Sequence, residues 1–442
     1  MTGPALGRKA PRTGRPGARR DTRATRAAWA GFLGGALEYY DFGIYLTASA
    51  LIFSRVLFST DGASAVLLSI GSFGLAYLAR PIGALVLGQL GDRIGRKRVL
   101  LACLVSMGAS TFLIGCLPTY SVAGAAAPAA LVVLRLVQGI SAGGEIAGSS
   151  VLIVEHAPDG RRGLFGAWAI NGPIAGFVLS NTVFVAVTAL PDEVLYTWGW
   201  RIPFWLSLLV LVVAYLVRRT IEEPEVFVAS ARDRPATLPL VELVRHHLGA
   251  VLRLTGCALF TVVNTVVAVF GLAYATGTAG LSPSFMLLVS IVANVVAIPV
   301  QTLGGHLSDR IGRRPVMITG SAGCAVGIFG YFAAIAAHQP ALVLLAAIVL
   351  TGGFYSLANG VYPAFFVEMF DVRVRYTGTA IGLQISQLVA GFAPLAATAL
   401  AGGHGAWTPA AILTAAVCLV AVVATRTARE TAREPLRDLG AR

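Results

Sequence analysis

The stretch Gly88-Gln-Leu-Gly-Asp-Arg-Ile-Gly-Arg-Lys-Arg98 is a short, strongly charged turn between two long apolar runs. It returns almost unchanged as Gly305-His-Leu-Ser-Asp-Arg-Ile-Gly-Arg-Arg314, so that Asp92 corresponds to Asp309, 217 residues later. A second set of charges repeats 213 residues apart: Glu155 with Arg162, and Glu368 with Arg375. The chain is therefore an internal duplication, and each half carries one charged turn in the same place.

The composition is that of a membrane protein. Of the 442 residues, 56% are hydrophobic and only 12% are charged, and the mean hydropathy is +0.76. Soluble domains carry about a quarter charged residues. Here the apolar residues come in runs close to twenty long, and a bilayer core of about 30 Å needs about 20 helical residues. These features predict a protein that crosses the membrane many times.

The apolar runs predict twelve transmembrane helices, because lipid offers no partner for unpaired backbone groups. They fall at residues 28–53, 64–90, 99–118, 128–155, 163–190, 200–217, 251–275, 284–306, 315–337, 341–367, 376–400 and 407–425. The longest hydrophilic stretch divides them into six plus six. The expected organisation is a disordered basic tail (1–26), a six-helix bundle (27–217), a central loop (218–250), a second six-helix bundle (251–425) and a tail (426–442).

The net charge of +13 reports orientation rather than binding to nucleic acid. All but four of the 34 Lys and Arg residues fall in the two tails and in alternate loops, if Arg253 is counted with the central loop. This positive-inside pattern places both termini in the cytoplasm, with some attraction to anionic lipid. The five cysteines are scattered through apolar segments without paired spacing, so we expect no disulfide, metal or cofactor.

Ionisable residues lie inside apolar runs only in the first half. Glu38 is about 15 Å from the start of its helix and shares a face with Asp41, three residues later. Arg80 is about 16 Å from the charged turn. Arg135 lies in the outer half of the fourth helix, and Glu145 is about 15 Å from its inner end. The second half offers only neutral polar side chains at this depth: Asn264, Asn294, Gln301, Asn359, Gln384 and Gln387.

These five charges have two interpretations. They can pair with one another only to hold helices together, a reading that is strongest for Arg135 and Glu145. Alternatively they line a polar cavity for ion-coupled transport, since charges in the bilayer core are costly and often functional. A buried carboxylate takes up a proton more readily, and its protonation releases a neighbouring Arg to meet a substrate anion. Proton and anion then favour each other's binding, as symport requires.

The charged turns are predicted to form a gate. Their glycines allow close helix approach, and Asp92 and Asp309 can face the N-terminus of a neighbouring helix. Such a latch can break and reform as two halves rock; the alternative is a plain positive-inside turn. The predicted gating residues are Gly88, Asp92, Arg93, Gly95 and Arg96 in the first turn, and Gly305, Asp309, Arg310, Gly312 and Arg313 in the second.

The repeated turn resembles the loop signature of the major facilitator superfamily, over about residues 27–425. Within it, the chain is similar to the metabolite:proton symporters, a group that includes α-ketoglutarate, citrate, shikimate and proline/betaine permeases. The stretches that carry this similarity are 38–42, 135–145, 199–205 and 218–227. The resemblance implies two pseudo-symmetric six-helix bundles, alternating access and proton-driven uptake across a bacterial plasma membrane.

The same resemblance implies which residues act, and some positions depart from the pattern. It points to Glu38, Asp41, Arg80, Arg135 and Glu145 for substrate and proton, and to the repeated turns for gating. Tyr39 stands where Trp is common, and Ile146-Ala-Gly148 follows Glu145 where many members have Tyr-Gly-Gly. Asn171-Gly-Pro173 falls where exporters of the superfamily carry a Gly-Pro motif.

The sequence thus predicts a monomeric proton symporter for a small organic anion such as a mono- or dicarboxylate, with Arg80 as the main anion contact. Asp41 or Glu38 would carry the proton. One alternative is uptake of a zwitterion or quaternary amine, held by these acids with Tyr39 and Tyr40. Another is drug-type proton antiport. An enzyme or a receptor is disfavoured because the chain shows neither a nucleophile or metal-ligand spacing nor a sizeable soluble domain.

Overall fold

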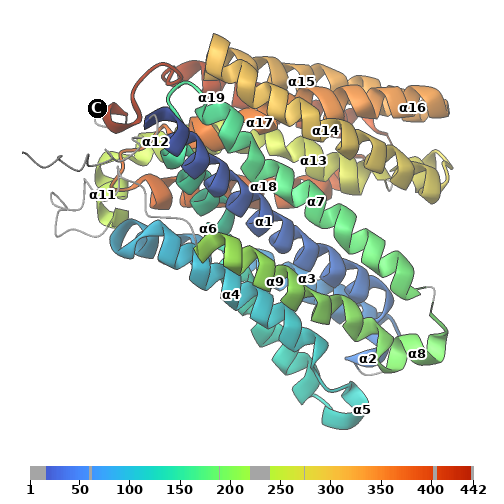
Figure 1. Cartoon of the computed structure of the whole chain (residues 1–442). Helices are drawn as coiled ribbons and strands as arrows, with labels where there is room; N and C mark the ends of the chain where they lie inside the picture. Colours follow the sequence, from blue (N-terminus) through green and yellow to red (C-terminus); the bar gives the residue numbers. More distant parts are fainter. Residues whose placement is uncertain are drawn as a thin grey trace, which may run out of the picture.

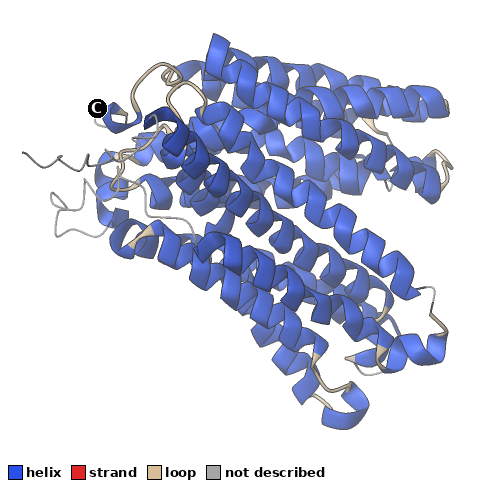
Figure 2. Ribbon diagram, in the orientation of Figure 1, coloured by secondary structure: helices blue, strands red, loops and turns tan. Residues whose placement is uncertain are grey.

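The computed structural model describes residues 16–58, 62–188, 190–219, 239–272, 274–401 and 406–439. Within these ranges all regular structure is helical (Figure 2). Ten of the helical segments are long and apolar enough to cross a membrane. Two further long helices, α1 and α3, carry Glu38, Asp41 and Arg80. The prediction of twelve membrane-spanning helices is confirmed.

The first half consists of six long helices and short connecting helices. The long ones are α1 (Pro16–Leu51), α3 (Gly62–Ile94), α4 (Arg96–Gly115), α6 (Ala126–His156), α7 (Arg162–Thr188) and α9 (Ile202–Arg219). The short ones are α2 (Phe53–Val56), α5 (Tyr120–Ala123), α8 (Asp192–Thr197) and η1 (Gly199–Arg201). Helix α1 begins ahead of the expected position, so residues 16–26, predicted to be disordered, are helical. Residues 1–15 lie outside the described part.

The second half repeats this plan with more irregular helices. After α11 (Pro239–His246), its long regular helices are α14 (Pro283–Ile311), α15 (Arg313–Ala336), α18 (Arg375–Ala401) and α19 (Thr408–Thr427). The seventh span is broken into α12 (Leu248–Ala258), η3 (Leu259–Thr261), α13 (Val262–Thr265), η4 (Val266–Gly271) and η5 (Tyr274–Thr278). The tenth combines α16 (Pro340–Ala347), η6 (Ile348–Tyr355) and α17 (Ser356–Val367). Residues 220–238 of the central loop lie outside the described part.

The π-helical segments η4, η5 and η6 distinguish these two spans from the rest. Single π-turns inserted in α-helices occur often at functional sites. The sequence predicted regular helices here, because the apolar period alone does not show a change of helical pitch.

The two bundles approach each other at one end of the molecule and diverge toward the other (Figure 1). The C-terminus lies at the end where they meet, as do the turns that carry Asp92 and Asp309; we call this the charged end. Close backbone contacts join the halves there. A Cβ on Gly163 would lie 2.3 Å from the Gly305 carbonyl oxygen, and one on Gly305 would lie 2.4 Å from the Gly163 oxygen. Glycine is therefore required at both positions.

The segment after α19 is also folded, although the sequence predicted only a tail. Residues 428–439 include the short helix η7 (Leu436–Asp438). Leu436 and Leu439 are buried against Val151 and Val154 of α6 and against Ala364 and Val367 of α17. This segment therefore packs on both halves of the molecule at the charged end.

Candidate functional site

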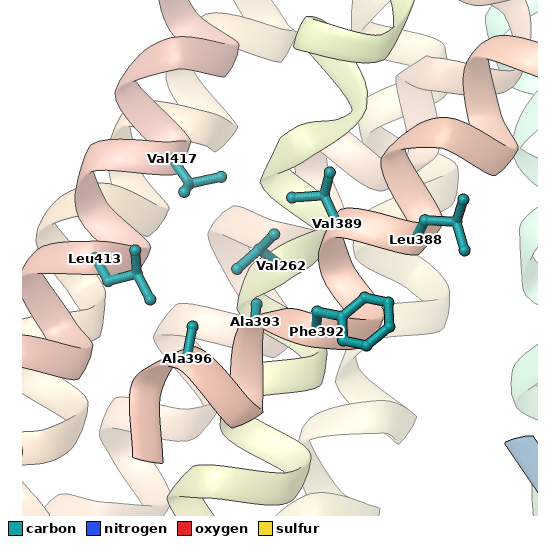
Figure 3. A pocket seen from close by; sticks show the side chains of 8 residues that line it. All are labelled: Val262, Leu388, Val389, Phe392, Ala393, Ala396, Leu413 and Val417. Carbon is teal, nitrogen blue, oxygen red and sulfur yellow. The ribbon is translucent and has the colours of Figure 1, made fainter. Parts of the chain in front are cut away.

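A groove between α13, α18 and α19 is lined only by apolar side chains (Figure 3). They are Val262, Leu388, Val389, Phe392, Ala393, Ala396, Leu413 and Val417. Phe392 and Val389 are exposed, as expected for residues that face hydrocarbon. Because this groove has no polar group to recognise a metabolite, the candidate site is sought among the buried charges of the first half.

Glu38 and Arg80 form an ion pair between α1 and α3. Arg80 Nη2 donates to Glu38 Oε1 at 3.0 Å, and both side chains are almost completely buried. The Arg80 guanidinium also lies 4.4 Å from the centre of the Phe42 ring, in a cation–π contact. The sequence placed both charges at similar depth, and the structure brings them together. Replacing such a buried pair by apolar residues is often neutral for stability, so its presence favours a functional role.

Asp41, on the same helix as Glu38, begins a hydrogen-bonded chain across three helices. The Thr111 hydroxyl of α4 donates to Asp41 Oδ2 at 2.5 Å, and Gln138 Nε2 of α6 donates to Thr111 Oγ1 at 2.6 Å. Arg135 Nη1 then donates to Gln138 Oε1 at 2.9 Å. The Arg135 guanidinium lies 3.7 Å from the centre of the Tyr45 ring. Asp41 and Arg135 thus belong to one network, joined through two neutral residues that the sequence analysis did not select.

The other predicted site residues are more dispersed. Glu145 accepts a hydrogen bond at 3.1 Å from Ser149, one turn further along α6. Tyr40 donates its hydroxyl to the Pro203 carbonyl at 2.8 Å and thereby joins α1 to α9. Tyr39 packs at 5.3 Å on the Phe177 ring of α7. The contact of Tyr40 thus joins two helices of the first bundle, whereas Tyr39, on the helix that carries Glu38 and Asp41, packs against α7 and stays a candidate for the site.

The second half contributes aromatic side chains that the sequence analysis missed. Tyr355 ends the π-segment η6, and Tyr362 follows on α17; their rings lie 5.5 and 6.4 Å from Phe260 of η3. Both tyrosines lie near Tyr39, and Tyr362 also lies near Glu38. The only sequence signal for them is a tyrosine hydroxyl inside an apolar run. Such tyrosines are common in helix cores, so this signal did not select Tyr355 or Tyr362.

Side-chain amides form hydrogen bonds between the two bundles. Gln384 Nε2 of α18 donates to the Gly143 carbonyl of α6 at 3.2 Å. Asn171 Nδ2 of α7 donates to Thr302 Oγ1 of α14 at 3.0 Å. Gln301 and Asn359, two amides noted from the sequence, are buried.

At the charged end, Asp92 binds the N-terminus of α18 in the other half. Its carboxylate accepts hydrogen bonds from the backbone N–H groups of Tyr376 at 3.2 Å and Thr377 at 2.8 Å, and from the Thr377 hydroxyl at 2.8 Å. These donors belong to the first turn of the helix, where N–H groups lack intrahelical partners and attract negative charge. The expected position of this carboxylate is confirmed.

Asp309 makes the symmetric contact with α7. It accepts hydrogen bonds from the backbone N–H groups of Gly163 at 2.8 Å and Leu164 at 2.9 Å. The two turns therefore cap one helix each in the opposite bundle. Gly95 and Gly312 follow them at φ of 110° and 106°, a backbone conformation that favours glycine.

The arginines of the two charged turns take different positions. Arg93 and Arg310 are exposed at the surface, while Arg313 is fully buried and pairs with Asp309 at 2.7 Å and with Glu368 at 3.1 Å. The side chain of Arg96 lies outside the described part. In the second turn, Arg313 thus reaches into the protein interior.

The charges that repeat with an offset of 213 residues meet across the bundle interface. Arg375 Nη1 donates to Glu155 at 2.8 Å, and Arg162 forms an ion pair with Glu368 at 3.2 Å. Glu368 is completely buried, yet its pKa is lowered: burial alone would raise it, but Arg313 and Arg162 stabilise its charge more strongly. Each half therefore supplies an Arg to the Glu of the other.

Comparison with known proteins fits this arrangement. The chain is 34% identical over 412 residues to the shikimate transporter of Escherichia coli K12, covering 91% of this chain and 94% of that relative. It is 32% identical to the proline/betaine transporter of the same organism, covering 94% and 86%. Residues 27–237 match the family "Sugar (and other) transporter", and residues 254–441 match "Major Facilitator Superfamily".

The chain belongs to the major facilitator superfamily. It is therefore a membrane transporter and not an enzyme, as the sequence predicted. Among solved structures, the proton:xylose symporter XylE bound to 6-bromo-6-deoxy-D-glucose has the same fold, with a TM-score of 0.76, 19% identity and coverage of 95% and 98%. An inward-open structure of XylE gives a TM-score of 0.63.

Proposed function

We propose that the protein is a proton-coupled symporter that imports a small organic anion, such as a mono- or dicarboxylate, by alternating access. The observation that carries this proposal is the buried pair of Glu38 and Arg80, with Asp41 on the same helix. Both signs of charge are present, so the site can hold a proton and an anion. A set of relatives named for shikimate and for proline/betaine supports a small polar metabolite as substrate.

In this mechanism the proton controls the availability of Arg80. With Glu38 ionised, the guanidinium is engaged by its carboxylate at 3.0 Å. Protonation of Glu38 removes the negative charge, and Arg80 becomes available to a substrate carboxylate near the Phe42 ring. Proton and anion then enter and leave together because each favours the other's binding.

Asp41 supplies a second protonation site. Its Oδ1 is buried without a hydrogen-bond partner in the described part of the chain, while Oδ2 is bound by Thr111. A buried polar atom without a partner is costly, more so when it carries charge. This imbalance favours proton uptake when the site closes to water.

The charged end is the cytoplasmic gate in this proposal, with both termini in the cytoplasm of a bacterium and the chain acting as a monomer in its plasma membrane. The caps made by Asp92 and Asp309, and the Glu–Arg pairs beside them, hold this gate shut. Opening the site to the cytoplasm requires these contacts to break while the bundles rock.

The test is external pH in lightly buffered, de-energised cells that express the protein. α-Ketoglutarate, citrate, shikimate, a simple monocarboxylate, proline and betaine are added in turn, with cells lacking the protein as control. Alkalinisation on addition of one of the acids supports proton symport of an anion, and Asp41→Asn or Glu38→Gln should abolish or uncouple it. Acidification would indicate antiport and overturn the direction of coupling.

A second candidate function is uptake of a zwitterion such as proline or betaine. Tyr362 lies near Glu38 and Tyr39, and Tyr355 lies near Tyr39. Aromatic faces beside a carboxylate bind cationic nitrogen. Similarity to proline/betaine transporters is consistent with it. Alkalinisation with proline or betaine, and not with the acids, would favour this function.

A further inference from the structure

The chain of hydrogen bonds from Arg135 to Asp41 has only one possible direction at its first two links. A guanidinium only donates, so the Gln138 oxygen must face Arg135 and the Gln138 amide N–H must face Thr111. Thr111 Oγ1 therefore accepts from Gln138. The single proton of the Thr111 hydroxyl remains to be placed.

Two acceptors lie within reach of that proton. Asp41 Oδ2 is 2.5 Å from Thr111 Oγ1, and the Met107 carbonyl oxygen, one turn back on α4, is 3.1 Å away. When Asp41 is ionised it can only accept, so the hydroxyl donates to it. When Asp41 is protonated on Oδ2 it becomes the donor, and the hydroxyl must turn to Met107.

We propose that Thr111 is the positioning residue of the Asp41 proton site, and that its hydroxyl transmits the protonation of Asp41 to Gln138 and Arg135. This inference rests on the proposed function, in which Asp41 binds a proton during transport. With Asp41 ionised, a continuous chain of aligned hydrogen bonds joins its negative charge to the Arg135 cation. Hydrogen bonds in such a chain polarise and strengthen one another. With Asp41 protonated on Oδ2, the Thr111 oxygen still accepts from Gln138 and now also from Asp41, but its proton points to the Met107 carbonyl and the dipoles are no longer aligned.

The surroundings restrict what else could act on Asp41. Ionisable neighbours are Glu38 and Tyr40 on α1 and Arg135 on α6, and Arg80 on α3 is paired with Glu38. In α4, α7 and α9, which also pack against α1, the ionisable residues other than Cys103 of α4 and Tyr215 of α9 lie at the helix ends on the charged side. Phe42, Ala76, Met107 and Ala142 form an apolar cluster at this level of the bundle. Thr111 is the neutral side chain that contacts the carboxylate directly.

The experiment is infrared difference spectroscopy of the full-length protein in lipid nanodiscs over a pH series, which needs no known substrate. The C=O stretching band of protonated Asp41 is identified by its loss in Asp41→Asn. Thr111→Val removes a charge-assisted hydrogen bond from the ionised form and a weaker one from the protonated form, so the midpoint of this band should move upward by about 1 pH unit. It should also raise the band's frequency, because protonated Asp41 loses its acceptor.

Three further variants separate this role from a structural one. Thr111→Ser keeps the hydroxyl and should restore the midpoint and frequency. Gln138→Leu keeps Thr111 but cuts the link to Arg135, and should shift the midpoint in the same direction by a smaller amount. Thr414→Val is the matched control, since Thr414 is also fully buried but bonds only to the Ala410 carbonyl of its own helix; it should leave the band unchanged.

The outcomes are distinguishable. Unchanged midpoint and frequency in Thr111→Val, with the Asp41 band present, would overturn the inference and leave the proposed function standing. If Asp41→Asn removes no band, Asp41 does not titrate, and both the inference and the assignment of the proton to Asp41 fail. Should Thr111→Val not yield a monodisperse protein, Gln138→Leu decides, and an unshifted midpoint there rejects the proposal.

Discussion

At the scale of single residues, the site consists of charges that are expensive to bury. Glu38, Asp41, Arg80 and Arg135 are each less than 5% exposed. Every one is matched by a partner from another helix or through a short chain of hydrogen bonds. A core of apolar residues would be as stable as an ion pair here, so the charges are best explained by what they bind.

Variants of the Glu38–Arg80 pair can test whether it serves stability or transport. Arg80→Met alone leaves the Glu38 charge buried, and should lower the free energy of unfolding by about 3–5 kcal/mol. Adding Glu38→Gln should restore most of that stability, while uptake stays lost in both variants. Thermal unfolding of the purified protein and uptake in cells measure the two effects.

Arg55→Met is the control for this pair, because Arg55 is exposed and hydrogen-bonds Tyr196 at the end of the molecule opposite the gate. It should change stability by less than about 0.5 kcal/mol. Transport by the double variant would show that the pair only holds α1 and α3 together.

The sequence revealed this site only in part. Charges inside apolar runs are conspicuous, so Glu38, Asp41, Arg80 and Arg135 could all be selected. Their partners could not, because pairing depends on how helices rotate against one another. Thr111, Gln138, Tyr355 and Tyr362 were missed for a different reason: neutral or aromatic residues are ordinary in a membrane helix, and only contacts show their role. For Gln138 a signal existed, since it lies three residues after Arg135 on the same helix face.

At the scale of elements, the proposed gate is built from helix termini. Asp92 on α3 caps α18, and Asp309 on α14 caps α7, so each cap joins one bundle to the other. Capping carboxylates ordinarily stabilise their own helix. Here the same interaction stabilises one arrangement of two bundles, because the donors and the acceptor lie in different halves.

Loss of a cap should therefore open the charged end. Asp92→Ala and Asp309→Ala should each weaken the closed state by about 1–2 kcal/mol, which corresponds to about a 5- to 30-fold larger open population. The measurement is the rate at which a maleimide labels Ala147→Cys in a protein without its native cysteines. Ala147 is buried among residues of both halves.

The matched control is Asp192→Ala, an aspartate in the first turn of α8, at the end away from the charged turns. It should leave the labelling rate unchanged. Equal rates in wild type and both gate variants would show that the caps do not control opening, and would return the charged turns to a topological role.

Element boundaries were predictable where chemistry marks them. The charged turns and Gly95 and Gly312 separate α3 from α4 and α14 from α15, close to the expected positions. The irregular seventh and tenth spans were not predictable, since π-segments have no period of their own in an apolar run. The irregular tenth span holds Tyr355 and leads to Tyr362, so two of the four missed site residues lie in a part of the fold that was also missed.

At the scale of the whole molecule, charges from three regions converge on the closed end. Arg162 of the first half and Arg313 of the second both pair with Glu368. Arg162 also donates to the carbonyls of Thr431, Ala432 and Glu434 in the C-terminal segment, at 3.2, 3.2 and 2.7 Å. The closed end is thus held by a network rather than by independent pairs.

The pH dependence of this network follows from Glu368, whose pKa is lowered below its ordinary value of 4.5. Because the folded pKa is depressed, the stabilisation is fully present above pH 4.5 and is lost as pH falls through the lower folded value. Glu368→Gln should destabilise the protein by about 3 kcal/mol at neutral pH. The difference from wild type should shrink as pH falls below 4.5, as measured by thermal unfolding in a pH series.

Glu434→Gln serves as the control for this series. Glu434 pairs with Arg429 at 2.7 Å, but both side chains are partly exposed, and such surface pairs contribute less than about 1 kcal/mol. A Glu368→Gln defect that stays constant down to low pH would contradict the assignment of the effect to the carboxylate charge.

The C-terminal segment (residues 428–439) should stabilise the closed state. Glu430 accepts hydrogen bonds from the backbone N–H groups of Arg313 and Arg314 at 2.8 and 3.0 Å and so caps α15. Removing residues 428–442 deletes this cap and exposes Arg162, which is buried under the segment. We expect labelling of Ala147→Cys to rise by about tenfold or more, equivalent to 1.4 kcal/mol, because closure loses several charge-assisted hydrogen bonds at once.

Glu430→Gln should give a smaller rise, and Arg433→Ala, an exposed position in the same segment, should give none. A truncated protein labelled at the wild-type rate would show that the two Asp caps and the Glu–Arg pairs close the gate without help from the segment.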